Sequence, residues 1–458
     1  MKKEYSSYRD PSGFVYREDD VILRHINKSY IDKFKHMHSS GLYDKLVSED
    51  MIIEHVLVKQ ESDYLIIKPD KVPFISYPYE WSFSQLKDAA ITTLEIHKQA
   101  MSYGMFMKDA SAYNIQFINN KPKLIDTLSF EFYKEGDPWV AYGQFCSHFL
   151  SPLLLMVEVD IRMLQMLRTN IDGIPIDLAS KLLKKKGGFA AKQHIHWHAK
   201  SVAKHAMDGK VEINKPKKFI KVSKFNHLAT INSLIKIIQN LKLDHVSTEW
   251  MNYYSNTNYT NQAFNSKSDI VAEYLKKIKP ESIWDLGAND GTFSRLAIKI
   301  GVKSVIAFDM DPVAVEKNYL MTENHTDDIF PLLFDIMNPS PCLGFNNGER
   351  LQVGDRSKPD CILALALIHH LCIGKNLPFE MIAESFSKQS NELIIEFVPK
   401  EDSQVEILLA TREDIFSQYN QDEFEIAFSK YYHITELNKI DDSNRTMFLM
   451  KKRGDYEI

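Results

Sequence analysis

Carboxylates placed around a glycine turn are the clearest chemical feature of this sequence. Asp285 precedes the turn, and Asp290 lies within it, between Gly287 and Gly291. A glycine turn after a strand also binds dinucleotides, whose pyrophosphate is held by free N–H groups at the start of the next helix. Acidic side chains at that place would repel a pyrophosphate. The turn therefore predicts a ligand that carries positive charge and no phosphate.

S-Adenosylmethionine fits this description, because it carries an ammonium and a sulfonium group and has no phosphate. Another carboxylate, Asp309, ends the next apolar stretch, 22 residues after Gly287. This is about the spacing at which an acidic residue at the tip of a second strand binds the hydroxyls of a ribose. We therefore expect an adenosyl cofactor whose ribose lies at Asp309.

A strand–turn–helix–strand unit must hold these groups. The apolar patterns predict a strand over residues 282–285, a helix over 292–300 and a second strand over 304–308. With these elements, the sequence resembles the class I S-adenosylmethionine-dependent methyltransferases. The resemblance implies methyl transfer on an α/β domain with a Rossmann-like, seven-stranded sheet.

The same resemblance implies a role for each cofactor residue. The turn would hold the methionine end, Asp309 the ribose and Met310 one face of the adenine, while Asp335 would accept from the adenine amine. Tyr259 and Lys267 lie in a segment that folds over the cofactor in related enzymes; alternatively, the tyrosine is an exposed residue at a helix entry. The complete expected set is Asp285, Gly287, Ala288, Asn289, Asp290, Gly291, Asp309, Met310, Asp335, Ile336, Tyr259 and Lys267.

The resemblance extends toward the C-terminus. Residues 359–370 look like the family's fourth strand, whose end borders the methyl acceptor, and 391–399 read as a fifth strand covered on both faces. Residues 431–437 and 445–451 fit a closing antiparallel pair. The resemblance thus covers roughly residues 250–455. The alternative is a glycine turn in a non-catalytic doubly wound sheet.

Candidate catalytic residues follow from the expected strand ends. Methyl transfer needs an acceptor lone pair aligned behind the S–CH₃ bond, so positioning supplies most of the catalysis, and a protonated acceptor also needs a base. His369 and His370, at the end of the fourth strand, are the candidate bases, and Glu396, at the end of the fifth, is a candidate for the acceptor pocket. Alternatively, the two histidines are core residues, and Glu396 belongs to a solvated loop.

A second group of residues with chemical potential lies in the first half of the chain. Asn114 lies five residues after Asp109, and Asp126 directly follows the second strand of an expected hairpin. This arrangement resembles the catalytic loop and metal-binding strand of protein-kinase-like phosphotransferases. The resemblance implies an α+β kinase-like domain in which Asp109 is the base, while Asn114 and Asp126 hold magnesium beside ATP.

The same region departs from the kinase pattern. Thr127 and Leu128 follow Asp126 where the family has Phe-Gly, and no glycine-rich loop precedes the region. Arg24 stands where the phosphate-binding lysine is expected, with Glu54 as its candidate helical partner. Two interpretations stay open: a domain that transfers phosphate, and a degenerate lobe that binds the acceptor or regulates the enzyme.

Chain length and these anchors predict three parts. They are a kinase-like domain over residues 1–180, a basic helical connector over 181–249 and a methyltransferase domain over 250–458. From Lys181 to Lys224 there are 13 lysines and only two acidic residues. A solvated linker face is the plainer interpretation. Contact with nucleic acid or an anionic glycan is the alternative, although neither arginines nor regularly spaced aromatic residues accompany the lysines.

Composition narrows the class of protein. The net charge of −5 gives no general attraction to nucleic acid or membranes, and 44% hydrophobic residues are typical of globular proteins. Four cysteines without CxxC spacing indicate neither a disulfide scaffold nor a zinc knuckle. The polar N-terminus is unlike a signal peptide, and no apolar run is long enough to span a bilayer. We therefore expect a soluble, cytoplasmic protein.

The resulting hypothesis is a methyltransferase that acts on a hydroxyl, or another nucleophile, of a small molecule or glycan. The two-part arrangement is most similar to bacterial methyltransferases described as nodulation-protein-like. The His-His pair stands where enzymes that methylate nucleobase amines carry an Asn-Pro-Pro-Tyr-like turn, which disfavours a nucleobase acceptor. The alternatives are a bifunctional kinase–methyltransferase that uses ATP and magnesium, and an RNA-binding methyltransferase.

Overall fold

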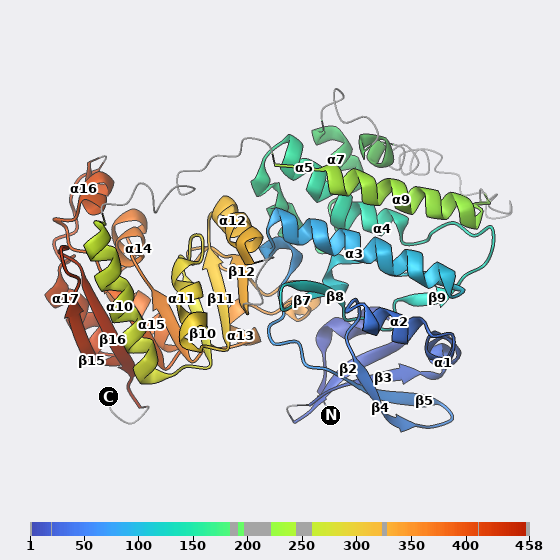
Figure 1. Cartoon of the computed structure of the whole chain (residues 1–458), viewed down its shortest axis with the longest axis horizontal. Coiled ribbons are helices and arrows are strands. Elements are labelled where there is room, and N and C mark those ends of the chain that lie inside the picture. The colour runs from blue at the N-terminus through green and yellow to red at the C-terminus, as the bar shows by residue number, and fades with distance from the viewer. Residues whose placement is uncertain are drawn as a thin grey trace. The chain divides into compact units, whose positions relative to one another are not determined.

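The chain divides into two compact units (Figure 1). Unit 1 comprises Met1–Val246 together with Pro341–Gln352, and unit 2 comprises Ser247–Ser340 and Val353–Ile458. The chain therefore leaves unit 2 after Ser340, contributes a short segment to unit 1 and returns. We call Pro341–Gln352 the returning segment. The computed structural model describes residues 2–19, 21–183, 191–196, 221–243, 259–322, 328–410 and 412–454.

Unit 1 begins with a five-stranded sheet in the order β1-β2-β3-β5-β4. Leu65 and Ile67 are buried on one face of its strand β5, whereas Lys68 is exposed, as the two-residue period of a half-buried strand requires. The strands are β1 (Lys2–Lys3), β2 (Gly13–Glu18), β3 (Val21–Asn27), β4 (His55–Gln60) and β5 (Tyr64–Pro69), with helices α1 (Ile31–Ser39) and α2 (Leu42–Ser48) between β3 and β4.

The rest of unit 1 is mostly helical. Its long helix α3 (Phe83–Ser102) starts with a capping box, in which Ser82 Oγ accepts from Gln85 N–H at 3.3 Å and Gln85 Oε1 accepts from Ser82 N–H at 2.7 Å. Helix α9 (Lys224–Asn240) lies along α3 (Figure 1). The other helices are α4 (Tyr142–Phe145), α5 (Ser151–Glu158), α6 (Met166–Thr169) and α7 (Ile176–Leu182).

Two small two-stranded sheets complete unit 1. Strands β7 (Ile115–Ile118) and β8 (Lys121–Leu124) form the expected hairpin, whose turn residues Asn119 and Asn120 both have positive φ. Strands β6 (Met105–Met107) and β9 (Phe130–Phe132) pair antiparallel. The short helices of unit 1 are η1 (Tyr5–Arg9), η2 (Lys28–Tyr30), η3 (Pro78–Glu80), η4 (Ala112–Asn114), η5 (Cys146–Leu150), η6 (Ile161–Gln165) and η8 (Phe345–Asn347).

Unit 2 is built on a seven-stranded sheet in the order β12-β11-β10-β13-β14-β16-β15. The first five strands in this order are parallel, and the last two close the sheet antiparallel. This order confirms the predicted methyltransferase-like α/β fold. The strands are β10 (Ser282–Leu286), β11 (Ser304–Asp309), β12 (Ile329–Leu333), β13 (Cys361–Ala364), β14 (Glu392–Phe397), β15 (Tyr432–Lys439) and β16 (Thr446–Lys452).

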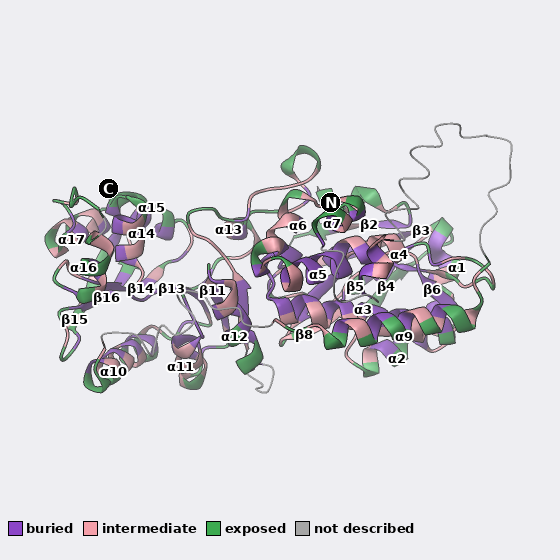
Figure 2. Ribbon diagram, turned by 90° about the horizontal axis from the view of Figure 1, so that it is seen from above, coloured by how far each residue is buried: buried purple, intermediate pink, exposed green. Residues whose placement is uncertain are grey.

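Helices cover both faces of this sheet, so most residues of its central strands are buried. Figure 2 shows buried positions along the strands and exposed positions on the outer side of α10. The helices are α10 (Asn261–Ile278), α11 (Thr292–Ile300), α12 (Pro312–Thr322), α13 (Val353–Arg356), α14 (Ile368–Lys375), α15 (Phe379–Ser387), α16 (Ser403–Leu409) and α17 (Gln421–Ser429). None of the described helices combines the length and hydropathy needed to cross a bilayer.

Two sequence expectations need correction. The fourth strand was expected over 359–370, but β13 ends at Ala364 and α14 begins at Ile368. Ala366 has a φ of 50°, a left-handed conformation that cannot continue a strand. Glu54 was expected on a helix as the partner of Arg24, but it is an exposed residue just before β4.

Candidate functional site

The glycine turn of unit 2 connects β10 to α11. Gly287, Asn289 and Gly291 all have positive φ, between 49° and 80°. A side chain at Gly291 would overlap the amide of Asn318, so this position requires glycine on grounds of space as well as conformation. The N–H of Gly287 donates to the carbonyl of Phe308 at 2.8 Å. The turn is thereby held against the end of β11.

Two carboxylates flank this turn at the ends of β10 and β11. Asp285 accepts from Ser294 Oγ at 2.6 Å, and Asp309 accepts from the N–H groups of Asn289 and Asp311, both at 2.8 Å. Burial raises the pKa of Asp285 and of Asp309 to about 6, against the opposing effect of these hydrogen bonds. Neither forms an ion pair with a described residue. A cationic ligand, or a ligand with hydroxyl donors, would stabilise the ionised form of both carboxylates.

The remaining predicted cofactor residues lie at the same edge, because the carboxyl ends of parallel strands coincide. Met310 follows Asp309 and is exposed. Asp335 and Ile336 are half-buried in the turn after β12, where Asp335 accepts from Met337 N–H at 2.8 Å. The structure thus brings the three predicted binding regions, at the ends of β10, β11 and β12, together.

Asp290 differs from its two neighbours, because protein groups already bind it. Its carboxylate accepts from Thr292 Oγ1 at 2.7 Å and from Lys317 Nζ at 3.2 Å. Arg295 Nη2 lies 3.8 Å from the same carboxylate. These contacts neutralise Asp290 and brace the turn, so it is less available to a ligand than Asp285 or Asp309.

Five polar side chains from separate segments meet near the carboxyl end of β14. Lys267 Nζ lies 2.7 Å from Glu396 Oε2, and Arg445 Nη1 lies 3.3 Å from Glu396 Oε1. Arg445 also binds Asp402 through two contacts, at 2.7 and 3.0 Å. The hydroxyl of Tyr259 donates to Glu396 and accepts from Arg445 at 2.6 Å. We call these five residues the buried charge cluster.

The cluster carries two cations and two carboxylates away from water. Burial alone would raise the pKa of Glu396, but Lys267 and Arg445 outweigh it and hold this pKa at about 2. Burial lowers the pKa of Lys267, and Glu396 opposes this. Desolvating two ion pairs costs several kcal/mol per ion, so such a group is weak evidence for stability. Buried, strongly shifted groups of this kind are instead candidates for a functional site.

The two predicted histidines lie in the first turn of α14, not at a strand end. His369 is fully buried, and neither of its ring nitrogens has a hydrogen-bond partner among the described residues. Burial lowers the pKa of His369 well below its usual range and that of His370 to about 4, and Arg445 adds to both effects. Both imidazoles are therefore neutral at pH 7. A buried ring without a partner is rare and requires an explanation.

Sequence reasoning missed Arg445. It was expected only as the first residue of a closing strand, whereas it contacts Tyr259, Glu396 and Asp402. The available signal was its position, because this charged residue directly precedes the apolar run Thr446–Met450. An arginine beside a buried strand is rarely unpaired.

In unit 1, the residues predicted from the kinase resemblance lie in one region, where other side chains of the same unit bind them. Asp126 forms an ion pair with Arg24 and accepts from Ser129 Oγ at 2.7 Å. Burial raises its pKa, but Arg24 and these hydrogen bonds lower it overall. Asn114 Nδ2 is 3.5 Å from the same Ser129 Oγ. No group of three or more potential metal ligands occurs in the part of the chain that the structure describes.

Asp109 is likewise engaged. It accepts from Gln144 Nε2 at 2.8 Å and from Ser111 N–H at 3.1 Å. Burial raises its pKa, and the charge of Asp126 raises it further. The structure therefore places Asp109 and Asp126 close enough for their charges to interact.

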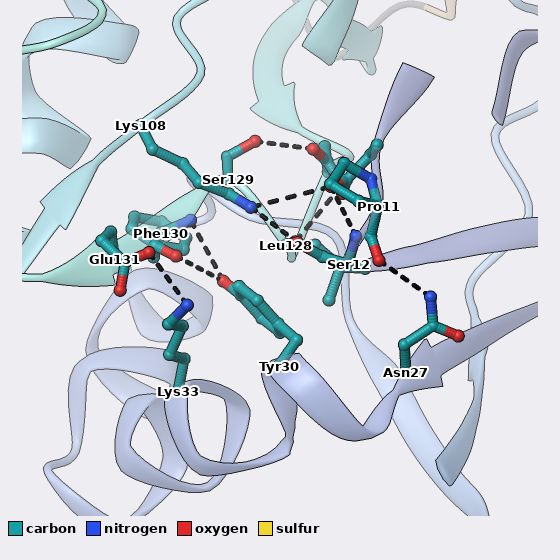
Figure 3. A network of polar contacts seen from close by, with 12 residues as sticks. Pro11, Ser12, Asn27, Tyr30, Lys33, Lys108, Leu128, Ser129, Phe130 and Glu131 are labelled. Carbon is teal, nitrogen blue, oxygen red and sulfur yellow. Dashed lines mark hydrogen bonds and ion pairs between the residues drawn. The ribbon is translucent and has the colours of Figure 1, made fainter. Parts of the chain in front are cut away.

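Lys108, directly before Asp109, connects the segment before β2 to this region (Figure 3). Its Nζ donates to Ser12 Oγ at 2.7 Å, and its N–H donates to the carbonyl of Ser129 at 2.8 Å. Tyr30 lies beneath it, with 4.9 Å between Nζ and the ring centroid. A side chain at Gly13 would collide with Leu128, so the segment packs directly on the residues after Asp126.

The returning segment is held in unit 1 by an anchor that the sequence did not indicate. Arg9 binds the buried Glu349 through two nitrogens, at 2.6 and 3.1 Å, and Tyr8 donates to the same carboxylate at 3.0 Å. Nearby, Leu351 N–H donates to Tyr77 Oη at 2.7 Å. Twelve residues that follow the proposed adenine-binding turn in sequence are thus built into unit 1.

Comparisons with solved structures gave low identities. The N-methyltransferase NodS of Bradyrhizobium japonicum WM9, in complex with S-adenosylhomocysteine, is 8% identical, with a TM-score of 0.33 over 45% of this chain and 100% of that chain. Magnesium protoporphyrin IX methyltransferase of Synechocystis PCC 6803, with bound S-adenosylhomocysteine, is 14% identical, with a TM-score of 0.30 over 42% of this chain and 84% of that chain. Likeness of this extent says nothing about the activity of this chain.

Comparison with known sequences was more informative. No protein-family model matches the chain. The nodulation protein NoeA of Rhizobium meliloti (strain 1021) is 34% identical over 457 residues, which span 97% of this chain and 95% of that protein. Because this identity extends across both units, the chain belongs to the same family as the nodulation protein NoeA.

Proposed function

We propose that this protein is an S-adenosylmethionine-dependent methyltransferase whose acceptor is a hydroxyl, or another nucleophile, of a small molecule or glycan. One observation carries the proposal: Asp285 and Asp309 flank a glycine turn at adjacent strand ends, and burial holds the pKa of each at about 6. A ligand with an ammonium, a sulfonium and a ribose diol would supply the charges and donors that these two carboxylates lack.

The residues of unit 2 fit this cofactor. The turn and Asp285 would hold the methionine end, Asp309 the ribose, and Met310, Asp335 and Ile336 the adenine. When bound, the cofactor supplies an electrophilic methyl group on its sulfonium. Lys267 belongs with the methionine end, because its charge acts on Asp285. Its ammonium has three N–H donors and would receive the carboxylate of that end.

The acceptor side uses the neutral histidines. We assign His369 and His370 as the groups that take the proton of a hydroxyl or ammonium acceptor, since both are uncharged at neutral pH and His369 has two unused nitrogens. Glu396 is a poor base, because Lys267 and Arg445 stabilise its ionised form. Its role is to position Tyr259, to which it is hydrogen-bonded.

Unit 1 is, in this proposal, a kinase-like lobe that binds the acceptor or regulates the enzyme. The groups that would hold magnesium and phosphate are bound within the protein: Asp126 is bound by Arg24 and Ser129, and Arg24, at the expected phosphate-binding position, is therefore itself paired. Phosphoryl transfer would need these contacts to open. The bifunctional kinase–methyltransferase is therefore the second candidate, favoured only by the raised pKa of Asp109.

Calorimetric titration separates these possibilities. S-Adenosylhomocysteine should bind the full chain with a stoichiometry of one, and ATP with magnesium should give no heat of binding. Binding of ATP that requires magnesium and disappears in Asp126→Ala would favour the bifunctional enzyme. If S-adenosylhomocysteine fails to bind a folded protein, the methyltransferase proposal is wrong.

A further inference from the structure

Unit 1 contains a hollow that the kinase-like residues Asp109, Asn114 and Asp126 do not line. It has a volume of about 550 Å³ and lies among the N-terminal segment, β2, β3 and the returning segment. Small-molecule sites commonly have volumes of about 300–1,000 Å³. We call it the aromatic pocket, after Tyr5, Tyr8, Phe14 and Phe345 in its lining; Asp10 and Asn27 lie beside them.

The walls of the aromatic pocket are exposed to an unusual degree. Tyr5 is 57%, Tyr8 59% and Phe345 71% exposed. Scattered single aromatic residues on a surface need no explanation, but several around one hollow indicate a binding site. None of the three belongs to the buried core of unit 1, although Tyr8 also helps to anchor the returning segment through Glu349.

The walls are also held in place. Tyr8 donates to Glu349 Oε1 at 3.0 Å, and the N–H of Phe345 donates to the same oxygen at 2.7 Å. Glu349 is in turn bound by Arg9. The rings of Tyr8 and Phe345 meet edge to face, with 6.2 Å between their centroids. A ligand would therefore enter a site that is already ordered, which reduces the entropic cost of binding.

Polar groups border the rings. Asp10 uses Oδ1 to accept from Ser12 N–H at 2.8 Å. Asn27 uses Nδ2 to donate to the carbonyl of Pro11 at 2.8 Å (Figure 3). Among the described residues, none donates to Asp10 Oδ2 or Asn27 Oδ1. The pocket thus combines aromatic surface with acceptor oxygens that remain available to a ligand.

The lining excludes several classes of ligand. Each charged side chain of the lining already has a partner: Glu4 pairs with Arg17, Asp10 lies 3.7 Å from Lys108 Nζ, and the Lys3 ammonium lies 3.9 Å from the centroid of the Phe14 ring. Neither a phosphate nor a cationic ligand would therefore find an unpaired opposite charge there. An acyl chain would desolvate these charges without pairing them. A sugar ring has an apolar C–H face for the aromatic rings and hydroxyl donors for the acceptor oxygens.

We propose that the aromatic pocket of unit 1 binds a neutral saccharide ring. This inference deepens the proposed function, because it makes unit 1 the lobe that recognises a glycan acceptor, and it rests on that function for this role alone. Binding itself requires neither cofactor nor methyl transfer. The two can therefore be tested separately on the same protein.

The test is saturation-transfer NMR and calorimetry on the full chain with neutral oligosaccharides of glucose, galactose, mannose and N-acetylglucosamine as probes. At least one probe should bind, with saturation strongest on its ring C–H protons. Phe345→Ala and Tyr5→Ala should each weaken binding about threefold to tenfold, the scale of losing one aromatic contact. Phe225→Ala is the matched control, because Phe225 is 79% exposed on α9 and does not line the pocket.

Three results would overturn the inference. They are no binding of any probe at concentrations up to about 10 mM, equal binding by the pocket variants and the control, and displacement of the saccharide by AMP or a fatty acid. The affinity for S-adenosylhomocysteine is measured in the same samples. If it is retained while saccharide binding is absent, the proposed function stands and the pocket assignment fails.

Discussion

Lys267 Nζ lies 2.7 Å from Glu396 Oε2, and both side chains are buried. The sequence predicted these residues for different tasks, the lysine for the cofactor and the glutamate for the acceptor. Their pairing joins α10, near the start of unit 2, to the end of the parallel strand β14. A residue predicted to bind the cofactor and one predicted to line the acceptor pocket therefore form one ion pair. Neutralising either side chain changes the electrostatic environment of the other.

Removing one partner of this ion pair should destabilise unit 2. Lys267→Met leaves Glu396 with Arg445 as its only cation, and Glu396→Gln leaves the buried lysine without its carboxylate. Each should lower the free energy of unfolding of unit 2 by about 3–5 kcal/mol, and the double variant by less than the sum, because it buries no unpaired charge. Urea denaturation followed by hydrogen exchange of amides in unit 2 measures this. Additive effects would mean that the two charges are not coupled.

The affinity for S-adenosylhomocysteine should rise with pH. Asp285 and Asp309 each have a pKa of about 6, so both are mainly protonated at about pH 5 and ionised at about pH 7. The ligand's ammonium and its ribose hydroxyls favour the ionised forms, so binding should strengthen across this interval and level off above it. Calorimetry at several pH values provides the test. Asp285→Asn should flatten the curve, whereas an affinity independent of pH in the unsubstituted protein would contradict the assignment.

The two histidines of α14 should remain neutral throughout the physiological range. Burial holds the pKa of His370 at about 4 and that of His369 well below its usual range. Their ¹H–¹⁵N long-range NMR signals, assigned with His369→Gln and His370→Gln, should not shift between about pH 8 and pH 6. Titration of either signal near pH 6.5 would remove the argument for a neutral base.

The returning segment should depend on its single buried carboxylate. Arg9→Ala leaves Glu349 ionised and buried, so it should lower the free energy of unfolding of unit 1 by about 3 kcal/mol. Glu349→Gln keeps a hydrogen-bonding group in place, so it should lower this free energy by less. Hydrogen exchange of residues 341–352 should speed up in Arg9→Ala. Arg17→Ala, which breaks an exposed ion pair with Glu4, is the control. Unchanged exchange in Arg9→Ala would show that other contacts hold the segment.

The part of unit 2 that is predicted to bind the cofactor could be predicted closely, because the sequence patterns that indicate it are local. The apolar runs, the glycine turn and Asp309 lie within one short stretch, and the observed β10, α11 and β11 match the expected elements. The end of the fourth strand could not be predicted in this way. Residues 361–368 are continuously apolar, so no period separates strand from helix, and the break depends on the φ of one residue, Ala366.

Contacts between distant residues were beyond sequence reasoning. Arg9 and Glu349 are 340 residues apart, and nothing near either one indicates the other. Arg24 was expected to pair with Glu54 by analogy with a kinase, whereas it pairs with Asp126. The same limit applies to the buried charge cluster, because its members come from α10 and the segment before it, β14, the residue before α16 and the residue before β16. Only the folded chain shows which charges meet.

The most direct test of the central claim is the affinity of Asp309→Ala for S-adenosylhomocysteine, measured by calorimetry beside Glu281→Gln. Glu281 is an exposed carboxylate just before β10, at the strand's opposite end, and serves as the matched control. Loss of charge-assisted hydrogen bonds to the ribose should weaken binding by about 1.5–3 kcal/mol, and the control should bind normally. Equal affinity of Asp309→Ala and the unsubstituted protein would contradict the account, because the ribose would then lie elsewhere.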